Sequence, residues 1–205
     1  MLGVAAAAAI AQGATHLIHV FVLDGRYADL LDADSNRSVF DIVSVVAEGS
    51  ACAACLALAG LYRSARPRFL ALAGLLAFIT VDDAIGLHDR IGVDWPLVLF
   101  PLLACTFVLL WSALDERRAS AYIRVGLLLL TMSVLLGQAA EPVLTAFGWG
   151  VGSWPYEIKI VIKQGAELAG WIVIAGALVM AAAAPSMRRA ASHAAGRRTA
   201  TSGSL

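Results

Sequence analysis

The chain has 205 residues, of which 60% are hydrophobic and 15% are charged, and its mean hydropathy is +0.79. Its 15 basic and 15 acidic residues balance to a net charge of zero, so no nucleic-acid partner is expected. A soluble domain is about a quarter charged and about half apolar. The composition therefore predicts an integral protein of the cell inner (plasma) membrane, with membrane lipids as its surroundings.

Apolar runs of about 20 residues, the length of a transmembrane helix, follow one another along the sequence. They predict an all-α bundle of six transmembrane helices that forms one domain over residues 1–182. The polar stretch 24–37 is expected to be a loop, and residues 183–205 a disordered cytoplasmic tail. The predicted spans cover residues 2–23, 40–62, 69–90, 96–114, 121–144 and 156–182.

Basic residues gather in segments that six crossings would place on one side of the membrane. The positive-inside rule makes that side cytoplasmic, so both termini are expected inside the cell. Trp95, Trp149 and Trp154 lie at the opposite ends of the spans, where an interfacial belt would lie. The basic residues are Arg63, Arg66, Arg68, Arg117, Arg118, Arg124, Arg188, Arg189, Arg197 and Arg198.

Polar side chains interrupt the first two spans at helical spacing. In span 2–23, His16 and His19 are three residues apart and share a helix face. Span 40–62 carries a stripe with intervals of three and four residues, which is also one face. Its two cysteines are expected to be small packing residues rather than a redox pair. The stripe consists of Asp41, Ser44, Glu48, Cys52 and Cys55.

Span 69–90 ends in a cluster of three carboxylates and an imidazole. Asp82 and Asp89 are seven residues apart and share a face, whereas His88 points about 100° away from Asp89. Adjacent Asp82 and Asp83 repel each other, so at least one of them needs a cation or a proton. These side chains therefore need partners, which lie on other helices or, for Asp83, are supplied by Arg90 seven residues later on the same face.

The last three spans differ in their polar content. Span 96–114 offers almost none, and span 121–144 offers Gln138 and Glu141 near its outer end. Span 156–182 carries a polar stripe at every fourth residue: Lys159, Lys163, Glu167 and Trp171. A rise of 1.5 Å per residue puts the polar groups of five spans about 5–16 Å below their outer ends. The inner half offers only Cys52, Cys55, Thr131 and Ser133.

This shared layer predicts a polar cavity that opens to the outside, and a metal site is the leading hypothesis for it. Imidazoles and carboxylates bind Zn²⁺, Fe or Mn, and helical bundles build such sites from facing helices. A metal-activated water would give a membrane-embedded hydrolase or oxidase acting on a small or lipid-like molecule. The expected ligands are His16, His19, Asp82, His88 and Asp89, the expected catalytic carboxylates are Glu48, Asp83 and Glu167, and Gln138, Glu141 and Lys163 complete the layer.

Other interpretations of the layer stay open. Buried carboxylates beside lysines are also the parts of a proton-coupled carrier of small solutes, although the inner half is a poor conduit. A non-catalytic accessory subunit of a larger membrane complex fits the small size of the chain. A structural network is a further alternative, since Lys163 and Glu167 lie four residues apart and can neutralise each other.

The segment 78–89 reads F-I-T-V-D-D-A-I-G-L-H-D. It resembles a signature of the form S-L-D-E-x-x-x-x-H-E in a family of uncharacterised bacterial multi-pass membrane proteins. The polar loop Leu31–Asp41 and the segment Glu167–Gly170 are similar to that family too. The resemblance implies a shared fold and a shared polar site, and it implies no activity. Asp83 and Asp89 stand where the family pattern has Glu, so each carboxylate is one methylene shorter.

Overall fold

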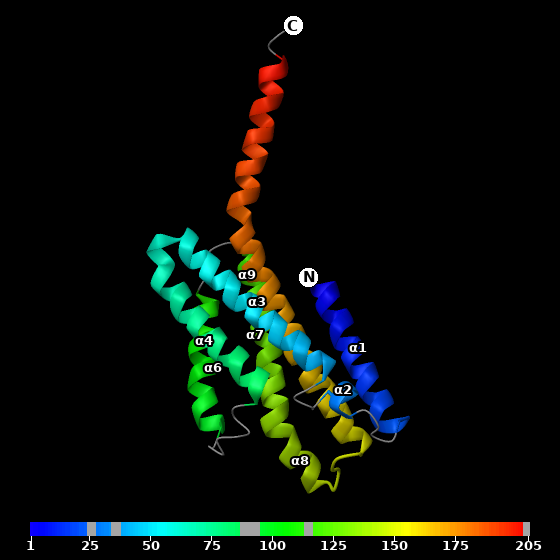
Figure 1. Cartoon of the computed structure of the whole chain (residues 1–205). Coiled ribbons are helices and arrows are strands. Elements are labelled where there is room, and N and C mark those ends of the chain that lie inside the picture. Colours follow the sequence, from blue (N-terminus) through cyan, green and yellow to red (C-terminus); the bar gives the residue numbers. More distant parts are fainter. Residues whose placement is uncertain (24–27, 34–37, 87–94, 113–116, 203–205) are drawn as a thin grey trace.

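The computed structural model describes residues 1–23, 28–33, 38–86, 95–112 and 117–202, and every element in these ranges is helical (Figure 1). The all-α prediction is therefore confirmed for the described part of the chain. The elements are α1 (Leu2–Phe21), α2 (Ala28–Leu31), α3 (Val39–Leu61), η1 (Arg63–Ala65), α4 (Arg66–Ile85), α6 (Trp95–Trp111), α7 (Arg117–Leu135), η2 (Leu136–Ala140), α8 (Glu141–Ala146) and α9 (Trp154–Ser202).

Long helices occur at each of the six predicted spans, and four described segments are long and apolar enough to cross a membrane. Helix α4 is not among them, because Arg66 and Arg68 open it and Asp82 and Asp83 close it, so any stretch long enough to span carries at least three of these charges. Helix α6 is shorter, with 17 residues. The four candidate spans are Leu2–Phe21, Val39–Leu61, Ala119–Ala146 and Trp154–Ala184.

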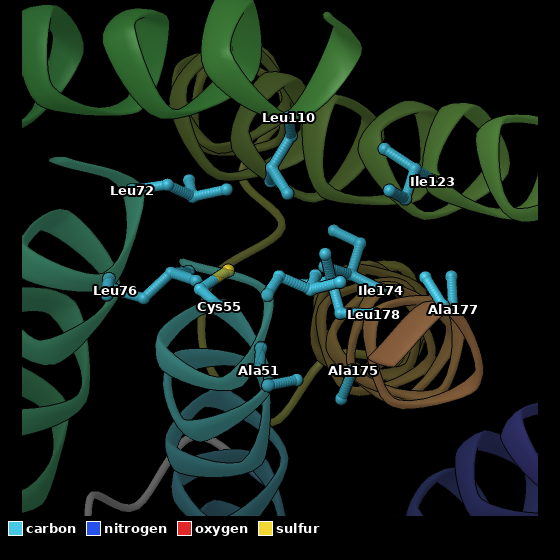
Figure 2. Close-up of a cluster of buried hydrophobic side chains, with 14 of the residues drawn as sticks. Ala51, Cys55, Leu72, Leu76, Leu110, Ile123, Ile174, Ala175, Ala177 and Leu178 are labelled. Atoms are coloured by element: carbon cyan, nitrogen blue, oxygen red, sulfur yellow. The ribbon is translucent and has the colours of Figure 1, made fainter. Parts of the chain in front are cut away.

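Helix α9 is the central element of the bundle and packs against α1, α3 and α7 (Figure 1). Helix α4 packs on the far side of α3, and α6 contacts α4 and α7. Figure 2 shows where side chains of these helices meet: Cys55 of α3, Leu72 of α4, Leu110 of α6, Ile123 of α7 and Ile174 of α9 form one buried apolar cluster. This core fixes the relative positions of α3, α4, α7 and α9, which carry most of the polar residues.

Two glycines allow the backbones of α7 and α9 to approach closely. A Cβ added to Gly170 would lie 2.9 Å from Leu130 Cγ and 3.0 Å from the carbonyl oxygen of Gly126. A Cβ added to Gly126 would lie 2.9 Å from the carbonyl oxygen of Gly170. Small residues serve in this way where transmembrane helices cross.

Local sequence explains where α3 begins and α4 ends. The hydroxyl of Ser38 accepts a hydrogen bond from the Asp41 N–H at 3.1 Å, and this cap begins α3. Gly86 adopts the left-handed conformation (φ 58°) and its N–H donates to the carbonyl of Asp82, which ends α4 at Ile85. The third predicted span, which continued to residue 90, was therefore too long. Residues 87–90 lie outside the described ranges.

The fifth predicted span is not a regular α-helix throughout. Segment η2 is π-helical and continues into α8. Pro142 lacks the N–H that would bond the carbonyl of Gln138, and a π-helical turn accommodates this loss.

At the other end of the bundle, α9 continues as a helix to Ser202 and projects beyond its neighbours (Figure 1). The disordered tail from residue 183, inferred from composition, stays a prediction.

Candidate functional site

Glu48 is the most deeply buried acid of the polar layer. Its side chain, on the inner face of α3, is 0% exposed. Oε1 accepts a hydrogen bond from the Ser44 hydroxyl at 3.4 Å, one turn earlier on the same helix. Oε2 has no hydrogen-bond donor among the described residues. A buried carboxylate with an unsatisfied oxygen is costly, because burial disfavours the charged form unless donors or cations surround it.

The neighbours of Glu48 are other acids. Asp83 of α4 lies within hydrogen-bonding reach of Glu48, and Glu167 of α9 lies close enough to repel both carboxylates. Asp41, two turns before Glu48, repels Asp83 and Glu167 as well. These four residues, Asp41, Glu48, Asp83 and Glu167, are called the acidic cluster below. Three predicted catalytic residues, on three different helices, therefore lie together.

Helix α7 also contributes to the acidic cluster. The Ser133 hydroxyl donates to Oε2 of Glu167 at 3.1 Å, so four helices meet at this site. The placement of Ser133 in a separate inner half was wrong. Ser133 and Glu167 lie at comparable distances from the outer ends of their predicted spans, so residue counting predicts a shared depth. Asp82, the neighbour of Asp83, is 3% exposed and repels it.

Lys163 and Gln138 differ in their surroundings. The Lys163 stem runs past Gly137 of η2, where an added Cβ would lie 3.4 Å from Lys163 Cε. Lys163 has contacts of its own and is partly buried. Gln138 is exposed. Neither Lys163 nor Gln138 is among the groups that act on Glu48 or Asp83.

Glu141 pairs with Lys159 rather than with the acidic cluster. Lys159 Nζ lies 3.2 Å from Glu141 Oε2 and 4.2 Å from the ring centre of Tyr156. The Glu141 side chain is 52% exposed, whereas that of Lys159 is 6% exposed. A half-exposed ion pair of this kind stabilises a protein by at most about 1 kcal/mol.

His16 forms a second buried polar group, at the end of the bundle where α9 begins. Its Nε2 lies 2.9 Å from Oε2 of Glu157, and its Nδ1 accepts the Ala33 N–H at 3.2 Å. Because Nδ1 accepts, Nε2 carries the proton and donates to Glu157. Asp32 Oδ1 lies 3.3 Å from Nδ1, and the Gly152 N–H donates to Glu157 Oε1 at 2.6 Å. Both ring nitrogens are thus engaged by protein groups.

The expected metal ligands do not converge in the part of the chain that the structure describes. No three His, Cys, Asp or Glu side chains there are arranged to hold one metal ion. His16 is bound to Glu157, His19 is buried at 3% exposure with contacts of its own, and His88 and Asp89 lie outside the described residues. The metal site and its Zn, Fe or Mn ion stay predictions.

The cysteines pack as expected. Cys52 Sγ donates to the carbonyl of Ala73 at 3.3 Å, and Cys55 is fully buried in the core. Both thiols are free, as is that of Cys105.

The chain belongs to a family defined by a domain of unknown function, DUF8692, which matches residues 1–193. Neither the curated proteins nor the solved structures contain a match to the chain. Membership agrees with the resemblance to an uncharacterised family. The bacterial source and the helix-three signature stay predictions.

Proposed function

We propose that this protein is a multi-pass membrane protein that carries a small solute in exchange for, or together with, protons bound at Glu48. In this proposal α4 and α6 cross the membrane with the four candidate spans, both termini are cytoplasmic, and the acidic cluster is reached from the outside. The observation that carries the proposal is the fully buried Oε2 of Glu48, which lacks a donor and faces other acids.

Charge balance supports this assignment. The described charged groups that act on Glu48 are Asp83 and Glu167, and both are acids. An ionised carboxylate in such surroundings costs several kcal/mol, whereas a protonated one can donate a hydrogen bond to Asp83. Glu48 is therefore a protonated acid whose proton is lost when a cation or water reaches it. Intramembrane acids of this kind mark proton pathways and substrate sites in transporters.

The core beside the cluster fits a carrier. Ala51 and Cys55 continue the Glu48 face of α3 into the apolar cluster of Figure 2, where they pack with Leu76 of α4. A carrier opens its site to one side at a time, so a packed apolar layer on one side of the acids is what one of its states requires. The predicted shortage of polar residues in the inner half is compatible with that state.

Proteoliposomes test the proposal directly. The full chain is reconstituted with a pH-sensitive dye inside, a pH gradient is imposed, and benzylamine, glycine, glucose and succinate are offered in turn. We expect one of them to change the internal pH with the wild type and not with Glu48→Gln. Glu141→Gln is the matched control, because it makes the same change at a half-exposed acid outside the acidic cluster.

Two results would overturn the proposal. One is a solute-driven pH change that is the same in Glu48→Gln as in the wild type. The other is the absence of any response together with copurification of larger subunits under mild detergent, which would favour the accessory role.

A further inference from the structure

The acidic cluster brings negative charge from three helices to bear on Glu48 and Asp83. The charged groups that act on Asp83 are Asp41, Glu48, Asp82 and Glu167, and every one of them is an acid. For Glu48 they are Asp83 and Glu167. One proton on Glu48 relieves only part of this repulsion. A ligand that binds among these carboxylates is therefore expected to be a cation.

The arrangement of the acids limits the kind of cation. A bare divalent metal ion needs its oxygen ligands about 2.0–2.6 Å away, so the ligands must nearly touch. The described residues include no three side chains with that geometry. The four carboxyls instead come from three helices and act on one another through charge. A larger cation can interact with several of them without converging ligands.

Once Glu48 has lost its proton, its Oε2 requires a hydrogen-bond donor. Oε2 has none among the described residues, and Glu48 is fully buried and within hydrogen-bonding reach of Asp83. A protonated primary amine carries three N–H donors and a full charge, so it can bridge two carboxylates with charge-assisted hydrogen bonds. A quaternary ammonium ion has the charge but no donor.

Apolar side chains adjoin the acids. Ala47 and Ala51 flank Glu48 on α3, and Ile79 lies one turn before Asp83 on α4, all within the buried core. A ligand with a hydrocarbon part next to its ammonium group would match both the charge and the apolar surroundings.

We propose that the acidic cluster binds a protonated organic amine, whose ammonium group takes the place of the proton at Glu48. This inference rests on the carrier function proposed above and names its cargo. On binding, the ammonium group donates hydrogen bonds to Glu48 and Asp83, and the Glu48 proton leaves to solvent. Asp41 and Glu167 add attraction without direct contact, and Ser44 and Ser133 keep the carboxylates oriented.

Binding is measured on the full chain in detergent with three related probes. Benzylamine has the charge and the donors, benzyltrimethylammonium has the charge alone, and benzyl alcohol has neither. Titration calorimetry gives the affinity, and a pH dye in weak buffer gives the protons released. We expect benzylamine alone to bind, with release of about one proton per chain, and Glu48→Gln to weaken it about 10- to 100-fold, as the loss of a charge-assisted hydrogen bond predicts.

Two further variants make the result interpretable. Glu141→Gln is expected to bind benzylamine as the wild type does, because Glu141 pairs with Lys159 away from the acidic cluster. Asp83→Asn is expected to weaken binding as Glu48→Gln does, and it replaces that variant if Glu48→Gln does not fold. Circular dichroism checks the helix content of each variant.

Several outcomes would overturn the inference. Equal affinity for benzyltrimethylammonium would remove the donor argument, and an Na⁺ response without a benzylamine response would assign the site to an inorganic cation. If no amine binds while another solute drives Glu48-dependent proton movement in liposomes, the cargo is wrong and the carrier function stands. If benzylamine binds through Glu48 and no proton movement occurs in liposomes, the amine site stands and the carrier function falls.

Discussion

Replacing Glu48 by glutamine tests whether Glu48 is protonated or is ionised and paired with a buried cation. The two states predict different changes in the free energy of unfolding. A protonated Glu48 accepts from Ser44 with one oxygen and donates to Asp83 with the other. The glutamine amide has the same shape and can make both hydrogen bonds, so the free energy of unfolding should change by less than about 1 kcal/mol. An ionised Glu48 held by a buried cation would lose a buried charge pair, at a cost of about 3–5 kcal/mol.

Alanine at the same position supplies the contrast. Glu48→Ala removes the partner of Ser44 and of Asp83 and leaves space at a position that is 0% exposed. A buried acceptor without a partner costs about 1–3 kcal/mol, and the lost packing adds to this cost. We expect the alanine variant to be less stable than the glutamine variant by at least about 2 kcal/mol.

The assay is equilibrium unfolding in mixed micelles with increasing dodecyl sulfate, followed by circular dichroism and tryptophan fluorescence. Wild type, Glu48→Gln, Glu48→Ala and Glu141→Gln are compared in one buffer. A loss of about 3 kcal/mol or more in Glu48→Gln would refute the reasoning, because a neutral acid cannot lose that much on isosteric replacement.

Two further predictions concern the packing that holds the site. His16→Ala removes the Nε2 donor from buried Glu157 and should cost about 1.5–3 kcal/mol in the same unfolding assay, whereas Thr15→Ala, at an exposed hydroxyl, should cost less than about 0.5 kcal/mol. Equal losses in the two variants would contradict a specific role for His16. Gly170→Ala places a Cβ against Leu130 and the Gly126 carbonyl and should cost about 1–3 kcal/mol, while Gly74→Ala meets no atom within 4 Å and should cause no loss. If Gly170→Ala leaves the midpoint of dodecyl sulfate unfolding unchanged, α7 and α9 do not cross at Gly170.

Helical periodicity explains why the sequence could indicate much of the acidic cluster. The three- and four-residue intervals place Asp41 and Glu48 on one face of α3, and the stripe on α9 gives the face of Glu167. The cost of burying charge then requires both faces to turn inward. Glu48, Asp83 and Glu167 lie together, although periodicity itself did not single out Asp83, and their catalytic role stays a prediction.

Periodicity describes one helix at a time, so the other polar contacts between helices could not be predicted from it. It does not say which helix a face meets, so it could not separate Glu48, which faces Asp83, from His16, which faces Glu157. Glu157 was missed because it lies off the stripe of α9, in the first turn. Lys159 was counted with the stripe, yet it turns toward Glu141.

Glycine and proline account for the differences between the predicted spans and the observed helices. Gly86 has a left-handed conformation that ends α4 directly after its acids, so Asp82 and Asp83 lie in the last turn of the helix. Pro142 removes a donor and is preceded by the π-helical turn of η2. Both residues interrupt apolar runs without lowering their hydropathy much, so the runs alone do not mark these helix bounds.

The protonation state of Glu48 is the central claim, and infrared spectroscopy measures it most directly. Spectra of the full chain in lipid are compared between wild type and Glu48→Gln, in water and in heavy water. We predict a protonated-carboxyl C=O band in the wild type that shifts in heavy water and is missing from Glu48→Gln, while Glu141→Gln retains it. An identical carboxyl region in wild type and Glu48→Gln would show that Glu48 is ionised and contradict the account.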